Sequence, residues 1–191
     1  YKYLKGGPGA PAFLYVAEDT QNQGWQPLSG WHGHAAPFAF ERDYVPATGL
    51  TAFRTGTHSA LVYAALEASL DLWQNVDMQA LRDKSLAMTE LFRHLLEEVL
   101  TTYGIDDVTP LKTERGSQVA LIYPENGYAV VQALIARGVI GDYREPGLMR
   151  FGFTPLYLGY EDVWQAAMHF REVLTTGEYR QERFQARSMV T

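Results

Sequence analysis

The feature that most constrains the fold is a long run of apolar residues at helical spacing in the middle of the chain. Between residues 78 and 103, apolar side chains return every three or four positions, which predicts an amphipathic helix. This stripe consists of Met78, Leu81, Leu86, Met88, Leu91, Phe92, Leu95, Leu96 and Val99. Gly104 provides a stop after Tyr103. At about 1.5 Å per residue such a helix can link two lobes, and core packing explains its stripe.

The chain before this helix is largely irregular. Residues 28–57 contain glycine at positions 30, 33, 49 and 56 and proline at 37 and 46, which excludes long helices. An irregular, aromatic stretch of this kind is typical of a functional loop or of a surface that covers a partner. From residue 59 to 74 the apolar residues regain helical spacing, and Thr57 or Ser59 can cap this shorter helix.

The chain after Gly104 alternates between short predicted elements. Strands are predicted at residues 108–113, 117–123, 139–143 and 149–153, with a charged turn at 114–116. Helices are predicted at 128–137 and 160–174, and the polar tail 177–191 has no clear core face. The pattern predicts a small α+β lobe over residues 76–191, preceded by a different unit over residues 1–75.

Composition narrows the class of protein. Of the 191 residues 47% are hydrophobic and 20% are charged, which is typical of a globular protein of one large domain or parts of two. The net charge of −6 argues against nucleic acid or an anionic membrane as a partner. No apolar run is long enough to span a bilayer. The absence of cysteine excludes disulfides, thiolate catalysis and cysteine zinc sites, and fits a reducing, cytoplasmic location.

Two features bear on candidate binding sites. His32 and His34 lack a clear third ligand, so no metal site is predicted. At the start of the chain, Tyr-Lys-Tyr indicates the end of a strand, a loop of glycines follows over residues 6–9, and a further strand is expected near 12–16. A lysine beside such a loop, Lys2, can meet a ligand phosphate or carbonyl; the alternative is a solvated lysine at a turn. Because the chain lacks a starting methionine and opens inside a predicted strand, we expect an N-terminal part to precede it.

Residues 1–9 resemble the cofactor-lysine segment of kynureninases, which are pyridoxal-phosphate enzymes of the aminotransferase-like fold. Similar segments follow in the same order at residues 28–34, 53–57, 150–151 and 154–157, although Lys5 stands where the family usually has asparagine. The resemblance implies an α/β fold of the aminotransferase-like, PLP-dependent type (fold type I). Residues 1–75 would then be the C-terminal part of the PLP-binding large domain, and residues 76–191 an interdomain helix with a small C-terminal domain.

The resemblance also implies roles for single residues. Lys2 would hold pyridoxal 5′-phosphate as an imine, and Tyr1 would donate to its phosphate and relay a proton. Trp31 and Thr57 would reach the phosphate of the neighbouring subunit in a homodimer. From the residues alone, tryptophan is more often core and threonine before a helix is more often a cap. Arg150 would bind the substrate carboxylate. From the residues alone, the alternatives are a salt bridge to an aspartate or glutamate, or an outward-facing position on an edge strand.

The implied function is hydrolysis of L-kynurenine or 3-hydroxykynurenine to an anthranilate and L-alanine, within tryptophan catabolism and NAD biosynthesis. His32 stands at a position often apolar in the family and is a candidate contact to the substrate ring. The alternatives are a cysteine desulfurase-like lyase, an aminotransferase, or a non-catalytic protein that kept the scaffold. The aromatic residues at positions 25, 31, 38, 40, 44 and 53 are expected to face a partner or a further part of the protein.

Overall fold

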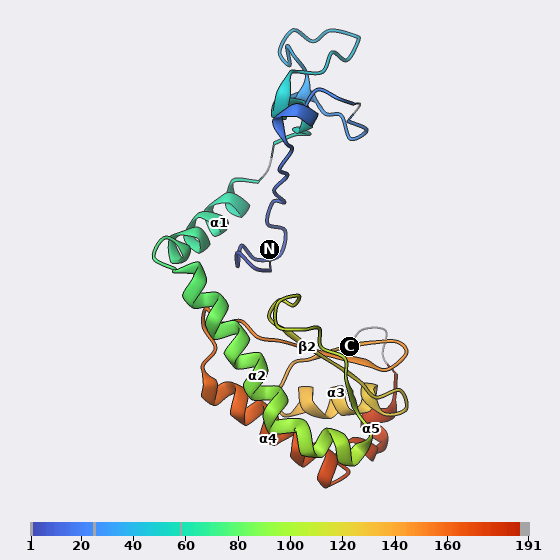
Figure 1. The fold of residues 1–191 in the computed structure, drawn as a ribbon. Coiled ribbons are helices and arrows are strands. Elements are labelled where there is room, and N and C mark those ends of the chain that lie inside the picture. The colour runs from blue at the N-terminus through green and yellow to red at the C-terminus, as the bar shows by residue number, and fades with distance from the viewer. Residues whose placement is uncertain (1, 25, 58, 188–191) are drawn as a thin grey trace. The chain divides into compact units, whose positions relative to one another are not determined.

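The structure is a computed structural model of residues 1–191, and it describes all of them except residues 1, 25, 58 and 188–191. The chain divides into two compact units, Tyr1–Val76 and Asp77–Thr191 (Figure 1).

The first unit consists mostly of loops. Among its described residues, the regular elements are three short 3-10 helices, η1 (Glu18–Thr20), η2 (Trp31–Gly33) and η3 (Gly49–Phe53), and one α-helix, α1 (Ala60–Trp73). The absence of long helices from residues 28–57 and the helix predicted over 59–74 are both confirmed. Ser59 occupies the N-cap position of α1, but its side chain makes no capping hydrogen bond.

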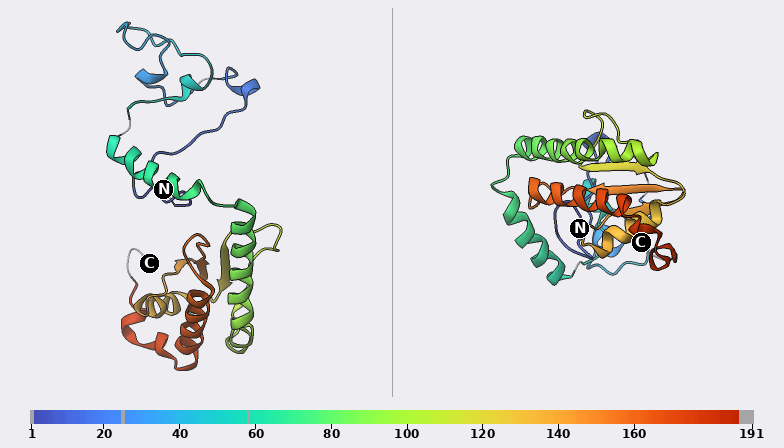
Figure 2. Two further views of the ribbon diagram at one scale, coloured as in Figure 1. Left: turned by 90° about the vertical axis from the view of Figure 1, so that its left-hand side faces the viewer. Right: turned by 90° about the horizontal axis from the view of Figure 1, so that it is seen from below.

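The strands predicted at the start of the chain are wrong. Tyr3 and Leu4 lie in a turn closed by the Lys5 N–H, which donates to the Lys2 carbonyl at 3.2 Å, and residues 10–17 have no regular structure. An alternating pattern alone forms no strand without a neighbour that completes the hydrogen-bond ladder. Instead, the turn at residues 3–4 lies beside α1 (Figure 2), where the Ser69 hydroxyl donates to the Leu4 carbonyl.

The second unit is built on α2 (Met78–Tyr103), whose bounds agree with the prediction. The Asp77 carboxylate accepts hydrogen bonds from the backbone N–H groups of Gln79 and Ala80 and so caps the first turn. At the other end Gly104 has φ 66°, the left-handed conformation that glycine adopts at least cost.

A four-stranded antiparallel sheet follows, in the order β1-β2-β4-β3. Its strands are β1 (Asp106–Asp107), β2 (Gln118–Ile122), β3 (Asp142–Arg144) and β4 (Leu148–Gly152). In the register of β2 and β4, Val119 pairs with Phe151 and Leu121 with Met149. These four side chains are buried and alternate along their strands with half-buried or exposed neighbours, so they lie on one face.

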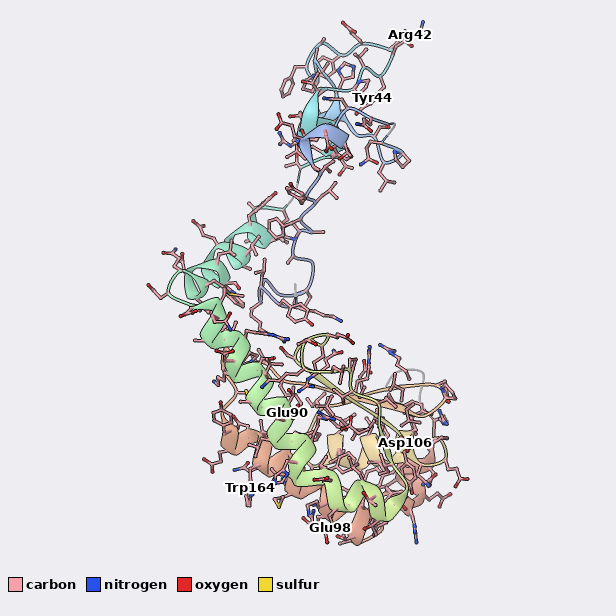
Figure 3. The ribbon with its side chains drawn as sticks, in the orientation of Figure 1. Arg42, Tyr44, Glu90, Glu98, Asp106 and Trp164 are labelled. Carbon is pink, nitrogen blue, oxygen red and sulfur yellow. The ribbon has the colours of Figure 1, made fainter. Side chains whose placement is uncertain are left out.

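That face packs against α2, α3 (Gly127–Ala136) and α4 (Tyr160–Thr175), which together with the sheet enclose the core (Figure 1). At the centre, the ring centroid of Phe92 lies 5.5, 5.2 and 6.3 Å from those of Phe151, Phe153 and Phe170. Trp164, by contrast, projects from the outer side of α4 and is 51% exposed (Figure 3).

Three predictions for this unit are wrong in detail. Residues 108–113 form no strand: the two-residue β1 ends at Asp107, and the Val108 N–H donates to the Ala120 carbonyl at 3.0 Å. The strand predicted over 139–143 is displaced to β3. The tail has a core face after all: η4 (Glu178–Arg180) and α5 (Glu182–Gln185) bury Tyr179 and Phe184. Among the described residues, no helix is both long and apolar enough to cross a membrane.

Candidate functional site

In the first unit, two glycines allow the loop around η2 to approach the chain that follows η3. A Cβ atom at Gly30 would lie 1.9 Å from the Thr55 carbonyl oxygen, and one at Gly33 would lie 2.7 Å from that of Arg54. Both distances are shorter than any contact a side chain could tolerate. The glycines are therefore required by the close approach of the two backbones, which brings residues 31–32 beside residues 54–57.

The side chains that meet there form a cluster centred on His32. Its Nε2 lies 3.3 Å from the Thr57 hydroxyl oxygen and its Nδ1 lies 3.4 Å from Arg54 Nη2. The Trp31 ring lies against it, with centroids 4.3 Å apart, and contacts Phe38 edge-on at 5.5 Å. We call Trp31, His32, Arg54 and Thr57 the His32 cluster.

The His32 cluster offers hydrogen-bond donors at the surface of the first unit. Trp31 is 47% exposed, and Arg54 and Thr57 are also exposed. An indole N–H, a hydroxyl and a guanidinium can all donate to an anion such as phosphate. Trp31 is therefore not a core residue, and the Thr57 hydroxyl is close to His32 while Ser59 occupies the N-cap position of α1.

The structure does not bring Lys2 into this cluster. Lys2 is exposed and lies in the N-terminal turn that packs on α1. Tyr1, the second residue assigned to the catalytic site, lies outside the described residues. Of the three candidate residues of the first unit that the structure describes, Trp31 and Thr57 are brought together, through His32.

Arg150 belongs to the second unit and lies in β4 with a half-buried side chain. Its Nε and Nη2 donate to the two carboxylate oxygens of Asp142 in β3, at 2.8 and 2.5 Å. These hydrogen bonds raise the pKa of Arg150 above its ordinary value, against a smaller opposing effect of desolvation. Asp142 takes one edge of the guanidinium, and the edge formed by Nη1 and Nη2 has the geometry to receive a second carboxylate.

Two residues of these sites were missed in the sequence. Arg54 lies within the segment 53–57 and Asp142 within 139–143, but neither had a signal of its own, since their contacts are made across loops and strands. Among the described residues no group of three or more histidine, aspartate or glutamate side chains could hold a metal ion.

Comparison with known proteins gives these sites a context. The family described as the kynureninase C-terminal domain matches residues 81–170. A kynureninase of Burkholderia mallei (strain SAVP1) and one of Pseudomonas fluorescens are each 47% identical over 192 aligned residues, covering 100% of this chain and 46% of the relative. The chain resembles kynureninases along its whole length. It spans about half the length of the curated kynureninases that it matches.

Solved structures show the same fold at low sequence identity. A C-DES mutant with glycine covalently linked to its PLP cofactor aligns with a TM-score of 0.63 at 18% identity, over 83% of this chain and 40% of that one. The apo cysteine desulfurase of Thermococcus onnurineus NA1 aligns with a TM-score of 0.65 at 15% identity, over 85% and 42%. The predicted fold class, α/β of the aminotransferase-like type, is confirmed.

Proposed function

We propose that this chain is the C-terminal portion of a pyridoxal-phosphate-dependent kynureninase. The complete enzyme hydrolyses L-kynurenine or 3-hydroxykynurenine to anthranilate or 3-hydroxyanthranilate and L-alanine. The observation that carries the proposal is the 47% identity to curated kynureninases along the whole chain. Tryptophan catabolism in the cytoplasm, leading toward NAD, is the setting we propose. Residues 1–75 end the cofactor-binding domain, and residues 76–191 form the interdomain helix and the small domain.

The donor set of the His32 cluster fits the phosphate group of the cofactor. Phosphate carries nearly two negative charges and accepts hydrogen bonds through three oxygens. Trp31 Nε1–H and the Thr57 hydroxyl would donate to it, while the Arg54 guanidinium contributes positive charge beside them. When bound, pyridoxal phosphate supplies an electron sink for the electron pair released as the substrate carbon–carbon bond breaks.

Lys2 would hold the cofactor, and once the substrate amine takes its place, the Lys2 amine is available to move protons at the substrate carbons. Its exposed position in the N-terminal turn leaves its side chain accessible to a ligand. Tyr1 is proposed as a further donor to the phosphate and as a proton relay. A lysine serves here because its amine can be both a nucleophile and, afterwards, a general base.

Arg150 would orient the substrate by its α-carboxylate. The Asp142 carboxylate fixes the plane of the guanidinium through Nε and Nη2, so that the Nη1–Nη2 edge meets the ligand in a defined direction. In this arrangement the salt bridge and the substrate contact coexist. The ion pair to Asp142 is then part of the binding site, because it holds the arginine in place.

We further propose a symmetric homodimer in which Trp31 and Thr57 complete the site of the partner subunit. The support is the exposure of large aromatic side chains in the same loops, with Phe38 at 73% and Phe40 at 85%. An isolated chain would leave this apolar surface in water. The position of Lys2, in a turn on α1 and not in the His32 cluster, is consistent with a cluster that serves the site of the partner subunit.

The function is tested by assaying the complete purified enzyme for visible absorbance and for anthranilate fluorescence with L-kynurenine. We expect a yellow protein that releases anthranilate and alanine in equal amounts. Lys2→Ala should abolish turnover, and borohydride reduction followed by peptide mapping should place the cofactor on Lys2; Lys5→Ala is the matched control and should keep both. A coloured protein that acts on cysteine or transfers amino groups would indicate another enzyme of this fold. A colourless, inactive protein would indicate a non-catalytic scaffold.

The dimer is tested by mixing two inactive variants. A Lys2→Ala subunit and a Trp31→Ala, Thr57→Ala subunit should regain activity together, because one hybrid site then has every group intact. If activity does not return after subunit exchange has been demonstrated, Trp31 and Thr57 serve the site of their own chain.

A further inference from the structure

We propose that His32 is a positioning residue that directs the Thr57 hydroxyl hydrogen toward the cofactor phosphate. The inference rests on the proposed function, in which Thr57 donates to that phosphate. It assigns His32 a role different from contact with the substrate ring. Arg54 then has a role too, because its contact with Nδ1 determines which ring nitrogen of His32 carries the proton.

The tautomer follows from the neighbours of the ring. Arg54 Nη2 lies 3.4 Å from Nδ1, and a guanidinium carries only donors. The Nδ1 atom must therefore accept, which leaves the proton of the neutral imidazole on Nε2. The opposite tautomer would place an Nδ1–H against an N–H of Arg54, with no acceptor between them.

The direction of the Thr57 hydroxyl follows in turn. Nε2 lies 3.3 Å from Thr57 Oγ1, so in this tautomer Nε2–H donates and Oγ1 accepts. The hydroxyl hydrogen must then point away from the imidazole. Because Thr57 is exposed, that hydrogen is presented at the surface, where the phosphate would accept it. Without His32 the hydroxyl could turn freely, and ordering it on binding would cost free energy.

The backbone holds His32 firmly enough for this role. It lies within η2, where the Gly33 N–H donates to the Gly30 carbonyl at 2.8 Å. The close approach of Gly30 to Thr55 ties this turn to the segment that carries Arg54 and Thr57. Contact with the Trp31 ring restricts the imidazole on a further side.

The test uses two amides that each replace one ring nitrogen. The amide of His32→Gln reaches the position of Nε2 and can still donate to Thr57, whereas that of His32→Asn reaches only the position of Nδ1. The readout is the equilibrium binding of pyridoxal phosphate to the complete apo-enzyme, compared with pyridoxal, which lacks the phosphate. Thr57→Val removes the hydroxyl, and His34→Asn is the matched control, because His34 contacts the backbone of Ala36 and Asp43.

We expect Thr57→Val and His32→Asn each to weaken pyridoxal phosphate binding about tenfold, as the loss of one hydrogen bond to a charged group predicts. Pyridoxal binding should be unchanged, and His32→Gln and His34→Asn should stay within about threefold of the parent. The double variant His32→Asn, Thr57→Val should bind as weakly as Thr57→Val alone, because the two residues act through one hydrogen bond.

Different failures have different meanings. If Thr57→Val weakens phosphate-dependent binding and His32→Asn does not, the inference is overturned while the proposed phosphate site stands. If His32→Asn and His32→Gln weaken both ligands equally, His32 is structural and the inference is again overturned. If Thr57→Val leaves pyridoxal phosphate binding unchanged, the phosphate role of Thr57 in the proposed function fails, and the inference fails with it.

Discussion

The two units differ sharply in how much apolar surface they bury. In the second unit α2, α3, α4 and the sheet enclose a continuous core in which Phe92, Leu96 and Val119 are almost fully buried. In the described part of the first unit, Leu66 is the only large apolar side chain that is buried. Several others are mostly exposed there, namely Tyr3, Phe13, Leu14, Tyr15, Leu28, Phe38, Phe40, Leu61 and Leu72.

This difference predicts which unit is stable by itself. Burial of apolar area is the main source of folding free energy, so the second unit can be stable by itself. The first unit carries Lys2 and the His32 cluster on loops whose large apolar side chains are mostly exposed.

The largest expected effect comes from separating the units. Residues 77–191 expressed alone should unfold in one cooperative transition in urea, followed by far-ultraviolet circular dichroism. Residues 1–76 alone should show no cooperative transition, because they bury too little apolar surface. A cooperative transition in residues 1–76 would break the comparison.

The next effect is a cavity in the second unit. Phe92→Ala should lower the free energy of unfolding of residues 77–191 by about 3–5 kcal/mol, since this ring packs against Phe151, Phe153 and Phe170. The control Ile140→Ala removes a side chain that is 82% exposed and should change it by less than about 0.5 kcal/mol. Equal losses in urea unfolding would mean that burial does not determine stability here.

Arg150, the proposed substrate-binding residue, lies in the well-packed unit and should behave differently from a core residue. Arg150→Lys keeps the charge but loses the paired N–H donors of the guanidinium. The transition-state stabilisation calculated from kcat/KM of the complete enzyme should therefore fall by about 2–4 kcal/mol. Cofactor absorbance should change little. Arg144→Lys is the control, because Arg144 also contacts Asp142, at 3.2 Å, but is 62% exposed. Normal kinetics for Arg150→Lys would assign it a structural role only.

The smallest effect concerns a charged pair on α2. Glu90 (Figure 3) accepts a hydrogen bond from the nearly buried Arg115, and this bond is the largest cause of its lowered pKa. Because the folded-state pKa lies below the ordinary value, the pair stabilises the fold above that value and loses this contribution as pH falls through the lowered pKa. Solvent screens Glu90, whose side chain is 47% exposed, so Glu90→Gln should cost about 1 kcal/mol at pH 7.

The measurement is the free energy of unfolding of residues 77–191 between pH 7 and about pH 3. The difference between parent and Glu90→Gln should shrink as the pH falls. Glu97→Gln is the control, since Glu97 is largely exposed and lies 3.9 Å from the ring nitrogen Nδ1 of His94. A constant difference across this range would show that the charge of Glu90 does not matter.

The sequence predicted those parts of the fold that depend on local rules. Helix α2 was found because apolar spacing and the terminating Gly104 act within a few residues. The tail was misjudged because Tyr179 and Phe184 stand in a polar run, and their burial depends on α3 far away in the chain. The first strands were misjudged because a strand requires a partner that the pattern does not reveal.

For the sites, family resemblance supplied the residues but not their surroundings. The resemblance assigned Arg150 to the substrate carboxylate, yet its partner Asp142 is set by the pairing of β3 with β4. The contact between His32 and Thr57 joins residues 25 positions apart. It depends on the backbone approach at Gly30, which no periodic pattern encodes.

That approach has a consequence for how the sequence can vary. Gly30 faces the Thr55 carbonyl so closely that even alanine would displace one of the two loops. Position 30 should accept glycine alone in a library of all amino acids selected for activity, whereas buried positions such as Leu121 should accept other apolar residues of similar volume. The least replaceable position would then lie in the less stable unit, at a residue that has no side chain.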